Sequence, residues 1–262
     1  MRRIAMGLSY IGEAYHGFQC QDDYISVQEH LEKAISQIAD HPVRISCAGR
    51  TDKGVHALLQ VVHFDTSVSR SLQAWEKGVN AHLPDDICIR WVQEVDGDFH
   101  ARFSARSRRY VYVLQHQARD LFLARYSWYV GVLDIASMQE AAVGLLGEHD
   151  FYAFQSRHCQ SDHAIRCIKE IRFEQKGQLT YCHIEANAFV HHMVRKIMAT
   201  LVAVGQGKMA IHAVREILQE KNREAVPGQA PAKGLFLRAI GYSNRYVFPD
   251  GDGSQLLGEM DV

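Results

Sequence analysis

The chain has 262 residues, of which 47% are hydrophobic and 23% charged, a balance typical of a globular protein with one or two domains. No apolar run reaches the roughly eighteen residues of a membrane span, and no signal-peptide pattern is visible, so no membrane partner is expected. The net charge of −1 neither supports nor excludes nucleic acid, because the last residues carry four acids and no base: Asp250, Asp252, Glu259 and Asp261.

Residues 1–105 alternate between strand and helix patterns. Ser26 and Glu29 have the spacing of a capping box, which predicts a helix over residues 26–40. Strands are expected over residues 4–10, 43–48, 58–65 and 87–95, and a second helix over residues 71–81. The order strand, helix, strand, strand, helix, strand is that of a split βαβ, or ferredoxin-like, half.

Residues 106–245 follow the same order in outline. The predicted elements are a strand over 109–115, a helix capped by Asp134, a hairpin of strands over 165–174 and 179–188, helices over 190–205 and 210–221, and a strand over 235–243. We therefore expect an α+β protein whose two halves join their antiparallel sheets, with helices on one face and a basic active-site cleft between the halves. The acidic tail, residues 246–262, is expected to be flexible.

Six cysteines are spread along the chain with neither a CxxC pair nor the spacing of zinc ligands. They fall in strand-like segments, which favours buried, reduced thiols and therefore a cytoplasmic location.

Asp52 lies in Gly49-Arg50-Thr51-Asp52-Lys53-Gly54, a tight connection between two strands. The glycines allow positive φ or close approach of another backbone, so the turn can present a carboxylate rigidly. An aspartate in such a turn commonly bonds its own backbone, and this structural role stays open. Arg50 and Lys53 beside it favour a second role, that of an ionised acid next to an anionic ligand.

Four arginines crowd residues 102–109, together with aromatic rings at Phe103 and Tyr110. A charge run is most often a solvated surface, but here no acid from residue 102 to residue 117 neutralises it. Arginines for phosphates beside a ring for a base indicate an RNA contact surface. Tyr110 begins a strand, where a place in the core is the alternative. The arginines are Arg102, Arg106, Arg108 and Arg109.

The helix over residues 190–205 has a broad apolar face, which predicts burial. Its cations Arg195 and Lys196, with His192, form a narrow stripe on the other side. They occupy the first turns, where the helix dipole disfavours positive charge, and no acid compensates them locally. We therefore expect an anion from elsewhere in the structure to meet them, either Asp52 or an RNA phosphate.

Fifteen histidines raise the question of a metal site. The candidates are the pair His191-His192, His56, His63 and the dyad His149-Asp150, which would fit a metal phosphohydrolase. The dyad follows a helix end, where capping explains it, and adjacent histidines cannot share one metal as an i, i+4 pair does. No metal is expected.

The stretch from Gly49 to Ala57, followed by Gln60-Val61-Val62-His63-Phe64, resembles the signature of the TruA-type tRNA pseudouridine synthases. The similarity runs from Tyr15-His16-Gly17-Phe18-Gln19 to Gly234-Leu235-Phe236-Leu237, and Phe189-Val190-His191-His192-Met193-Val194-Arg195 resembles another motif of the family. The chain departs from the pattern where glycines are usual, at Leu59, Ala186 and Ala188.

The resemblance implies an isomerase that converts uridines at positions 38, 39 and 40 of the tRNA anticodon stem-loop to pseudouridine. It implies Asp52 as the catalytic nucleophile or base, Arg195 as the partner that keeps it ionised, and Tyr110 against the target uracil. Contacts to the RNA are expected from a wider set of residues: Arg50, Lys53, Arg106, Arg108, Arg109, Tyr110 and His192.

No cofactor is expected, because the glycosidic bond is broken and remade without oxidation or hydrolysis. Members of the family are homodimers, and symmetric dimers are the commonest soluble oligomers, so a homodimer is expected. Two other functions stay open: a non-catalytic RNA-binding module that uses the same basic surface, and the metal phosphohydrolase.

Overall fold

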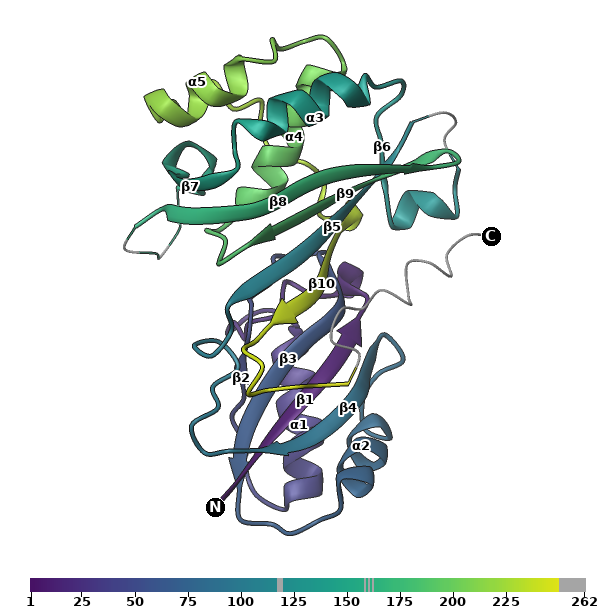
Figure 1. Ribbon diagram of the computed structural model, residues 1–262. Helices are drawn as coiled ribbons and strands as arrows, with labels where there is room; N and C mark the ends of the chain where they lie inside the picture. The colour runs from purple at the N-terminus through teal and green to yellow at the C-terminus, as the bar shows by residue number, and fades with distance from the viewer. Residues whose placement is uncertain (117–119, 158, 160, 162, 250–262) are drawn as a thin grey trace. The chain divides into compact units, whose positions relative to one another are not determined.

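The computed structural model describes residues 1–116, 120–157, 159, 161 and 163–249 (Figure 1). The chain forms two compact units, unit 1 from Met1–Arg108 with Phe236–Val262 and unit 2 from Arg109–Leu235. Both units combine helices with β-strands, which confirms the predicted α+β class. None of the helices in these described ranges has the length and apolarity needed to span a bilayer.

Unit 1 is built on β1 (Arg2–Tyr10), which pairs antiparallel with β3 (His56–Thr66) and with β4 (Ile87–Val95). The short β2 (Ser46–Cys47) pairs with the other edge of β3, so the order is β4-β1-β3-β2. This is the strand order of the ferredoxin-like half that the sequence predicts. Both helices of the unit lie on one face of this sheet: α1 (Val27–Ala39) and α2 (Leu72–Asn80) (Figure 1).

The two helices of unit 1 begin where their capping residues predict. The Ser26 side chain accepts a hydrogen bond from the backbone N–H of Glu29, and Ser71 accepts one from Ala74. Trp75 of α2 is fully buried with its ring 5.4 Å from that of Phe64 on β3. The predicted strand over residues 43–48 is observed only at the two residues of β2.

Unit 2 has the strand order β5-β9-β8-β7, formed by β5 (Ser107–Gln115), β9 (Leu179–Ala186), β8 (Ile165–Lys176) and β7 (Gly147–Asp150). The β8–β9 hairpin turns at Gly177, which has a φ of 53°. The short β6 (Trp128–Tyr129) pairs parallel with β5. Three helices lie on one face: α3 (Ile135–Val143), α4 (Met193–Gly205) and α5 (Ala213–Glu220) (Figure 1).

The last strand, β10 (Leu235–Gly241), explains why the units differ from the predicted halves of residues 1–105 and 106–245. It follows α4 and α5 in the chain, as the last strand of a second split βαβ would. From Phe236 onward it belongs to unit 1, where it pairs parallel with β3. The pairs β3–β10 and β5–β6 also correct the expectation that the sheets are purely antiparallel.

The first residues of the predicted flexible tail, 246–249, pack against unit 1. The ring of Phe248 stacks on Trp91 of β4, with centroids 4.7 Å apart and planes 11° apart. Tyr246 packs edge-on against Phe99 at 4.9 Å. The expectation is therefore wrong for residues 246–249, because two aromatic side chains attach this segment to unit 1. Residues 250–262 lie outside the described part of the chain.

Candidate active site

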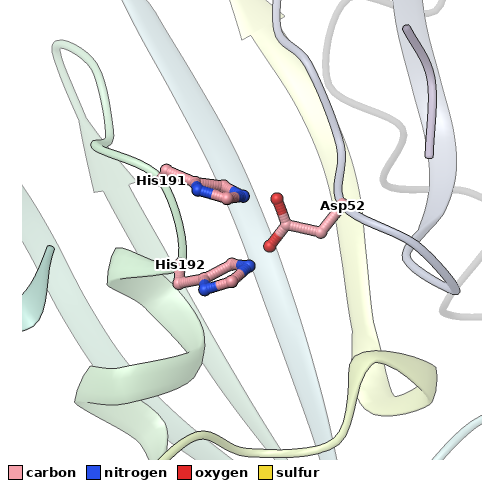
Figure 2. A group of neighbouring side chains, drawn as sticks. All are labelled: Asp52, His191 and His192. Atoms are coloured by element: carbon pink, nitrogen blue, oxygen red, sulfur yellow. The ribbon is translucent and has the colours of Figure 1, made fainter. Parts of the chain in front are cut away.

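Asp52 lies on the loop between β2 and β3, which we call the Asp52 loop (residues 49–55). Its side chain is half-buried and projects from the loop just ahead of β3 (Figure 2). The backbone oxygen of Asp52 accepts a hydrogen bond from Val55 at 3.1 Å, and Gly54 has a φ of 77°, so a tight turn follows the aspartate. This hydrogen bond involves the main chain of Asp52, and a bond of its carboxylate group to the turn stays a prediction.

A second loop, which connects β1 to α1, supports the Asp52 loop. Phe18 donates its N–H to the Thr51 oxygen at 3.1 Å, and Gly54 donates to the Tyr15 oxygen at 3.3 Å. Gly17 has a φ of 99°, and a Cβ there would come within 2.7 Å of the Thr51 oxygen. Only glycine permits this close approach of the two loops, which fixes the backbone on both sides of Asp52.

Gln60 holds the start of the Asp52 loop. Its side chain is fully buried on β3, and its amide oxygen accepts hydrogen bonds from Gly49 at 3.3 Å and Val61 at 3.1 Å. The amide nitrogen donates to the oxygen of Gly49. The Gln60 side chain thus satisfies both the N–H and the C=O group of Gly49, which lies outside the strands.

Replacing Gln60 by leucine is expected to lower the free energy of unfolding by about 1–3 kcal/mol, because it leaves buried backbone groups of Gly49 unpaired. Catalysis is expected to fall as well, since Asp52 follows in the same loop. Chemical denaturation and single-turnover assays measure the two effects. Gln93→Leu, at a half-exposed position of β4, is the matched control. Unchanged stability in Gln60→Leu would show that Gly49 finds other partners.

The two cations beside Asp52 are both exposed. The Nζ of Lys53 lies 2.8 Å from the Nε2 of His16, whose ring stacks on Tyr24 at 4.2 Å. Since an ammonium group only donates, the His16 nitrogen is the acceptor in this contact. Substrate binding by Arg50 and Lys53 stays a prediction.

The basic segment (residues 102–109) divides into two kinds of arginine. The Arg108 guanidinium donates to three backbone oxygens, those of Ala48, Arg102 and Ala105, at 2.8–3.3 Å. In unit 2, the Nε of Arg109 lies 2.9 Å from the Glu185 carboxylate. Glu185 thus compensates the charge of Arg109, and local sequence patterns could not predict this because Glu185 lies far along the chain. Arg102 and Arg106 are exposed, which suits contact with a phosphate.

Tyr110 is buried in β5 with 8% of its surface exposed, and the ring of Phe189 meets it edge-on at 5.2 Å. This burial agrees with the core alternative that the sequence leaves open for Tyr110. A position against uracil stays a prediction.

His191 and His192 lead into α4, and their rings lie with centroids 3.8 Å apart (Figure 2). His192 is the residue before the helix and has a φ of 67°. A left-handed backbone is uncommon for a residue with a side chain and is often found at functional sites. His192 is therefore held in an unusual conformation next to the first turn of α4.

Backbone oxygens meet the cations of α4. Lys196 donates to the oxygens of Gln155 at 2.9 Å and Ala153 at 3.4 Å, and burial lowers the pKa of its ammonium group. The Nε of Arg195 donates to the Ala230 oxygen at 2.7 Å, while the Ala230 N–H donates to the Arg195 oxygen at 3.0 Å. For Lys196, the dipoles of these two carbonyl groups supply the negative potential that the sequence led us to expect from an anion.

The candidate metal ligands His56, His63, His149 and Asp150 each contact another group of their own unit, either a backbone group or a charged side chain. Asp150 pairs with Lys221 at 2.7 Å, and the Nε2 of His149 lies 2.8 Å from the Leu146 oxygen. The Nδ1 of His56 accepts from Gly12, and that of His63 accepts from Ala101. A phosphohydrolase centre on the His149-Asp150 dyad has no support in this arrangement.

Sequence reasoning assigned no role to Gln60 or to the segment around Ala230. The signal for Gln60 is its place inside the apolar strand Leu58-Leu59-Gln60-Val61-Val62, since a buried amide must find hydrogen bonds. Ala230 offers no comparable signal, because it acts through its backbone alone.

Comparison with known proteins gives strong matches. The family model described as tRNA pseudouridine synthase matches residues 8–104 and 141–243. The tRNA pseudouridine synthase A of Shewanella loihica is 45% identical over 94% of this chain and 95% of its own length. Its namesake in Vibrio cholerae is 46% identical over 95% of each chain, and that of Photobacterium profundum is 47% identical over 94% of this chain and 95% of its own length.

Proposed function

Because the chain belongs to the family of tRNA pseudouridine synthases, we propose that Asp52 is the catalytic carboxylate of an enzyme that isomerises uridines 38, 39 and 40 of the tRNA anticodon stem-loop. The protein is an isomerase of tRNA uridine. In this reaction the N1–C1′ bond breaks, the uracil turns, and a C5–C1′ bond forms. The C5 position loses its proton and N1 gains one, so the reaction needs no oxidant and no water.

The observation that carries the proposal for Asp52 is the fixing of its loop. Hydrogen bonds with Tyr15, Phe18 and Gln60 hold the backbone on either side of the aspartate. A rigid carboxylate next to Arg50 and Lys53 suits a substrate in which a sugar carbon gains positive character beside a phosphate. Asp52 acts on that carbon as a nucleophile or removes a proton as a base.

Further residues complete the proposed site. Arg195 is the partner that keeps Asp52 ionised, and loop residue Ala230 orients its guanidinium. Arg50 fills the space that the uracil leaves when it flips out of the stack. Tyr110 lies against the flipped uracil, and His192, Arg106 and the other cations hold the RNA backbone.

Tyr110→Phe separates the hydroxyl of this side chain from its ring. If the hydroxyl assists proton transfer at the uracil, we expect tRNA affinity to be unchanged and the turnover number to fall by about 10- to 100-fold. Single-turnover kinetics and filter binding measure the two quantities. Tyr112→Phe is the matched control, since its hydroxyl donates to the Pro231 oxygen in the same unit. Normal turnover by Tyr110→Phe would exclude a role for the hydroxyl and leave only the ring as a contact for uracil.

A homodimer is the proposed assembly, because one 29.7 kDa subunit is short compared with a whole tRNA. If two subunits share one tRNA, the basic segment of one supports the Asp52 of the other. Mixing Asp52→Asn with a protein carrying Arg102→Ala and Arg106→Ala is then expected to restore activity through heterodimers. Arg108 and Arg109 stay in place because they bond to backbone oxygens and to Glu185.

Light scattering and an exchange assay accompany this mixing experiment. A monomeric mass at micromolar concentration, or no rescue from subunits shown to exchange, would contradict the shared site.

The isomerase reaction itself is tested by incubating chelator-treated protein with unmodified tRNA transcript and mapping pseudouridine. We expect product at positions 38, 39 and 40. Binding without product would leave the non-catalytic RNA-binding module, and product that requires added metal would contradict the metal-independent reaction.

A further inference from the structure

Phe103 is an unusually exposed aromatic residue on the basic segment, with 76% of its surface accessible. Its ring packs on the imidazole of His100, with centroids 4.3 Å apart and planes inclined by 36°. His100 therefore supports the ring, while most of the Phe103 surface stays accessible to solvent. A supported ring differs from a freely rotating surface phenylalanine, because its orientation is set before any ligand arrives.

His100 is itself fixed. Its Nδ1 accepts hydrogen bonds from the backbone N–H groups of Arg102 and Phe103, at 3.2 and 3.3 Å. The buried ring of His63 contacts the His100 ring edge-on, with centroids 4.6 Å apart. Burial, with the charges of Arg3 and Arg102, lowers the pKa of His100, so its ring is neutral when it accepts these bonds.

The backbone of this turn is also held in place. The Ser104 hydroxyl accepts from the His100 N–H at 3.0 Å, and Tyr242 donates its hydroxyl to the Ala101 oxygen at 2.8 Å. The Arg108 guanidinium donates to the Arg102 oxygen at 2.8 Å. The turn that carries the exposed ring of Phe103 is thus fixed by five side chains, those of His63, His100, Ser104, Arg108 and Tyr242.

The charges around the ring are positive. The guanidinium carbon of Arg102 lies 5.6 Å from the ring centroid of Phe103, and Arg106 is exposed three residues further on. The nearest acids before the turn, Asp96 and Asp98, both pair with Arg245, at 3.0 and 3.3 Å. A phosphate that approaches Phe103 therefore meets the cations Arg102 and Arg106. The two acids, Asp96 and Asp98, repel it less because Arg245 already pairs with them.

We propose that Phe103, backed by His100, is a stacking platform for one unpaired nucleobase of the tRNA substrate, with Arg102 on the phosphate beside that base. Unpaired bases stack on aromatic side chains whatever their sequence, because every base has a π face. This inference rests on the proposed function and adds to it a residue that binds RNA without touching the reacting atoms.

A second copy of this chain is the competing occupant of the ring. Two copies that met at this turn across a two-fold axis would bring their Arg102 and Arg106 side chains together, and such like-charge contacts are unfavourable. RNA offers the opposite charge. The surroundings of Phe103 therefore favour the nucleic acid.

The test measures binding of unmodified tRNA transcript in an Asp52→Asn background, so that substrate is not consumed. Phe103→Ala is expected to weaken binding by about 5- to 100-fold, the range for loss of one base–aromatic stack. Phe103→Leu, which keeps apolar volume without a π face, is expected to lose most of the same affinity. Phe103→Trp is expected to bind at least as well as the parent.

Salt dependence separates stacking from charge. Phe103→Ala is expected to shift affinity equally at all salt concentrations, whereas Arg102→Ala lowers the slope of log K against log salt by about one. In otherwise wild-type protein, Phe103→Ala is expected to raise KM while leaving kcat at saturating tRNA unchanged. Phe122→Ala removes an even more exposed phenylalanine from unit 2 and is the matched control for tRNA binding.

Parent-like affinity in Phe103→Ala or Phe103→Leu would overturn the platform, and so would loss of self-association with unchanged tRNA affinity. These results are distinct from failure of the proposed function. Weaker binding by Phe103→Ala in a protein that makes no pseudouridine would support the platform and reject only the isomerisation. Normal binding by Phe103→Ala in an active enzyme would reject only the platform.

Discussion

Asp52→Asn is expected to abolish pseudouridine formation, with a loss of at least about a thousandfold in single-turnover rate, while tRNA affinity changes little. The amide keeps the size of the carboxylate but can neither attack carbon nor take a proton at neutral pH. The loop is expected to keep its shape, because Tyr15, Phe18 and Gln60 form hydrogen bonds with its backbone and not with the Asp52 carboxylate group. Rapid-quench assays with labelled tRNA and equilibrium binding give the two values.

Asp23→Asn is the control for this experiment, since it makes the same change at an exposed position of unit 1. It should leave both quantities unchanged. Appreciable turnover by Asp52→Asn would remove Asp52 from the chemistry. Loss of tRNA binding in step with turnover would instead assign Asp52 to substrate recognition.

Arg195→Ala is expected to lower turnover by about 100-fold or more with a much smaller effect on tRNA affinity, because it removes the proposed partner of the Asp52 carboxylate. Arg195→Lys is expected to be poorly active as well, since an ammonium group cannot form the two parallel bonds of a guanidinium. Kinetics at saturating tRNA distinguish turnover from binding.

The pH profile separates this role from a structural one. A neighbouring cation holds the pKa of an aspartate down, so its removal raises that pKa and moves the acid limb of the rate profile to higher pH. Gln229→Ala removes an amide oxygen that accepts from the Arg195 guanidinium at 2.6–3.2 Å, and so tests whether the orientation of Arg195 matters for turnover. A normal pH profile and normal turnover in Arg195→Ala would show that Arg195 is not paired with Asp52 in the working enzyme.

Local patterns predicted the helices well, because the features that define them are close in sequence. The caps Ser26, Ser71 and Asp134 all accept hydrogen bonds from N–H groups three residues later. The place of β10 could not be predicted in this way. It depends on pairing of Phe236 with His56, which lie at opposite ends of the chain.

The site shows the same division. Asp52 and its flanking cations can be recognised in the sequence, because glycines and charged residues are identified by residue type alone. The support around them is largely invisible there. Glu185 beside Arg109 and the carbonyl oxygens at Lys196 come from distant segments, and a carbonyl group belongs to every residue alike.

The parallel pairing of β10 with β3 has a consequence for biosynthesis. Translation delivers His56 early and Phe236 only near the end, so the N-terminal segment leaves the ribosome long before its last strand exists. Until then one flank of β3 near Ala57 has no partner strand, and such an edge attracts other chains. This connectivity makes the last pairing of the sheet wait for synthesis of the C-terminal strand, and a nascent chain stalled before residue 236 is expected to expose this edge of β3.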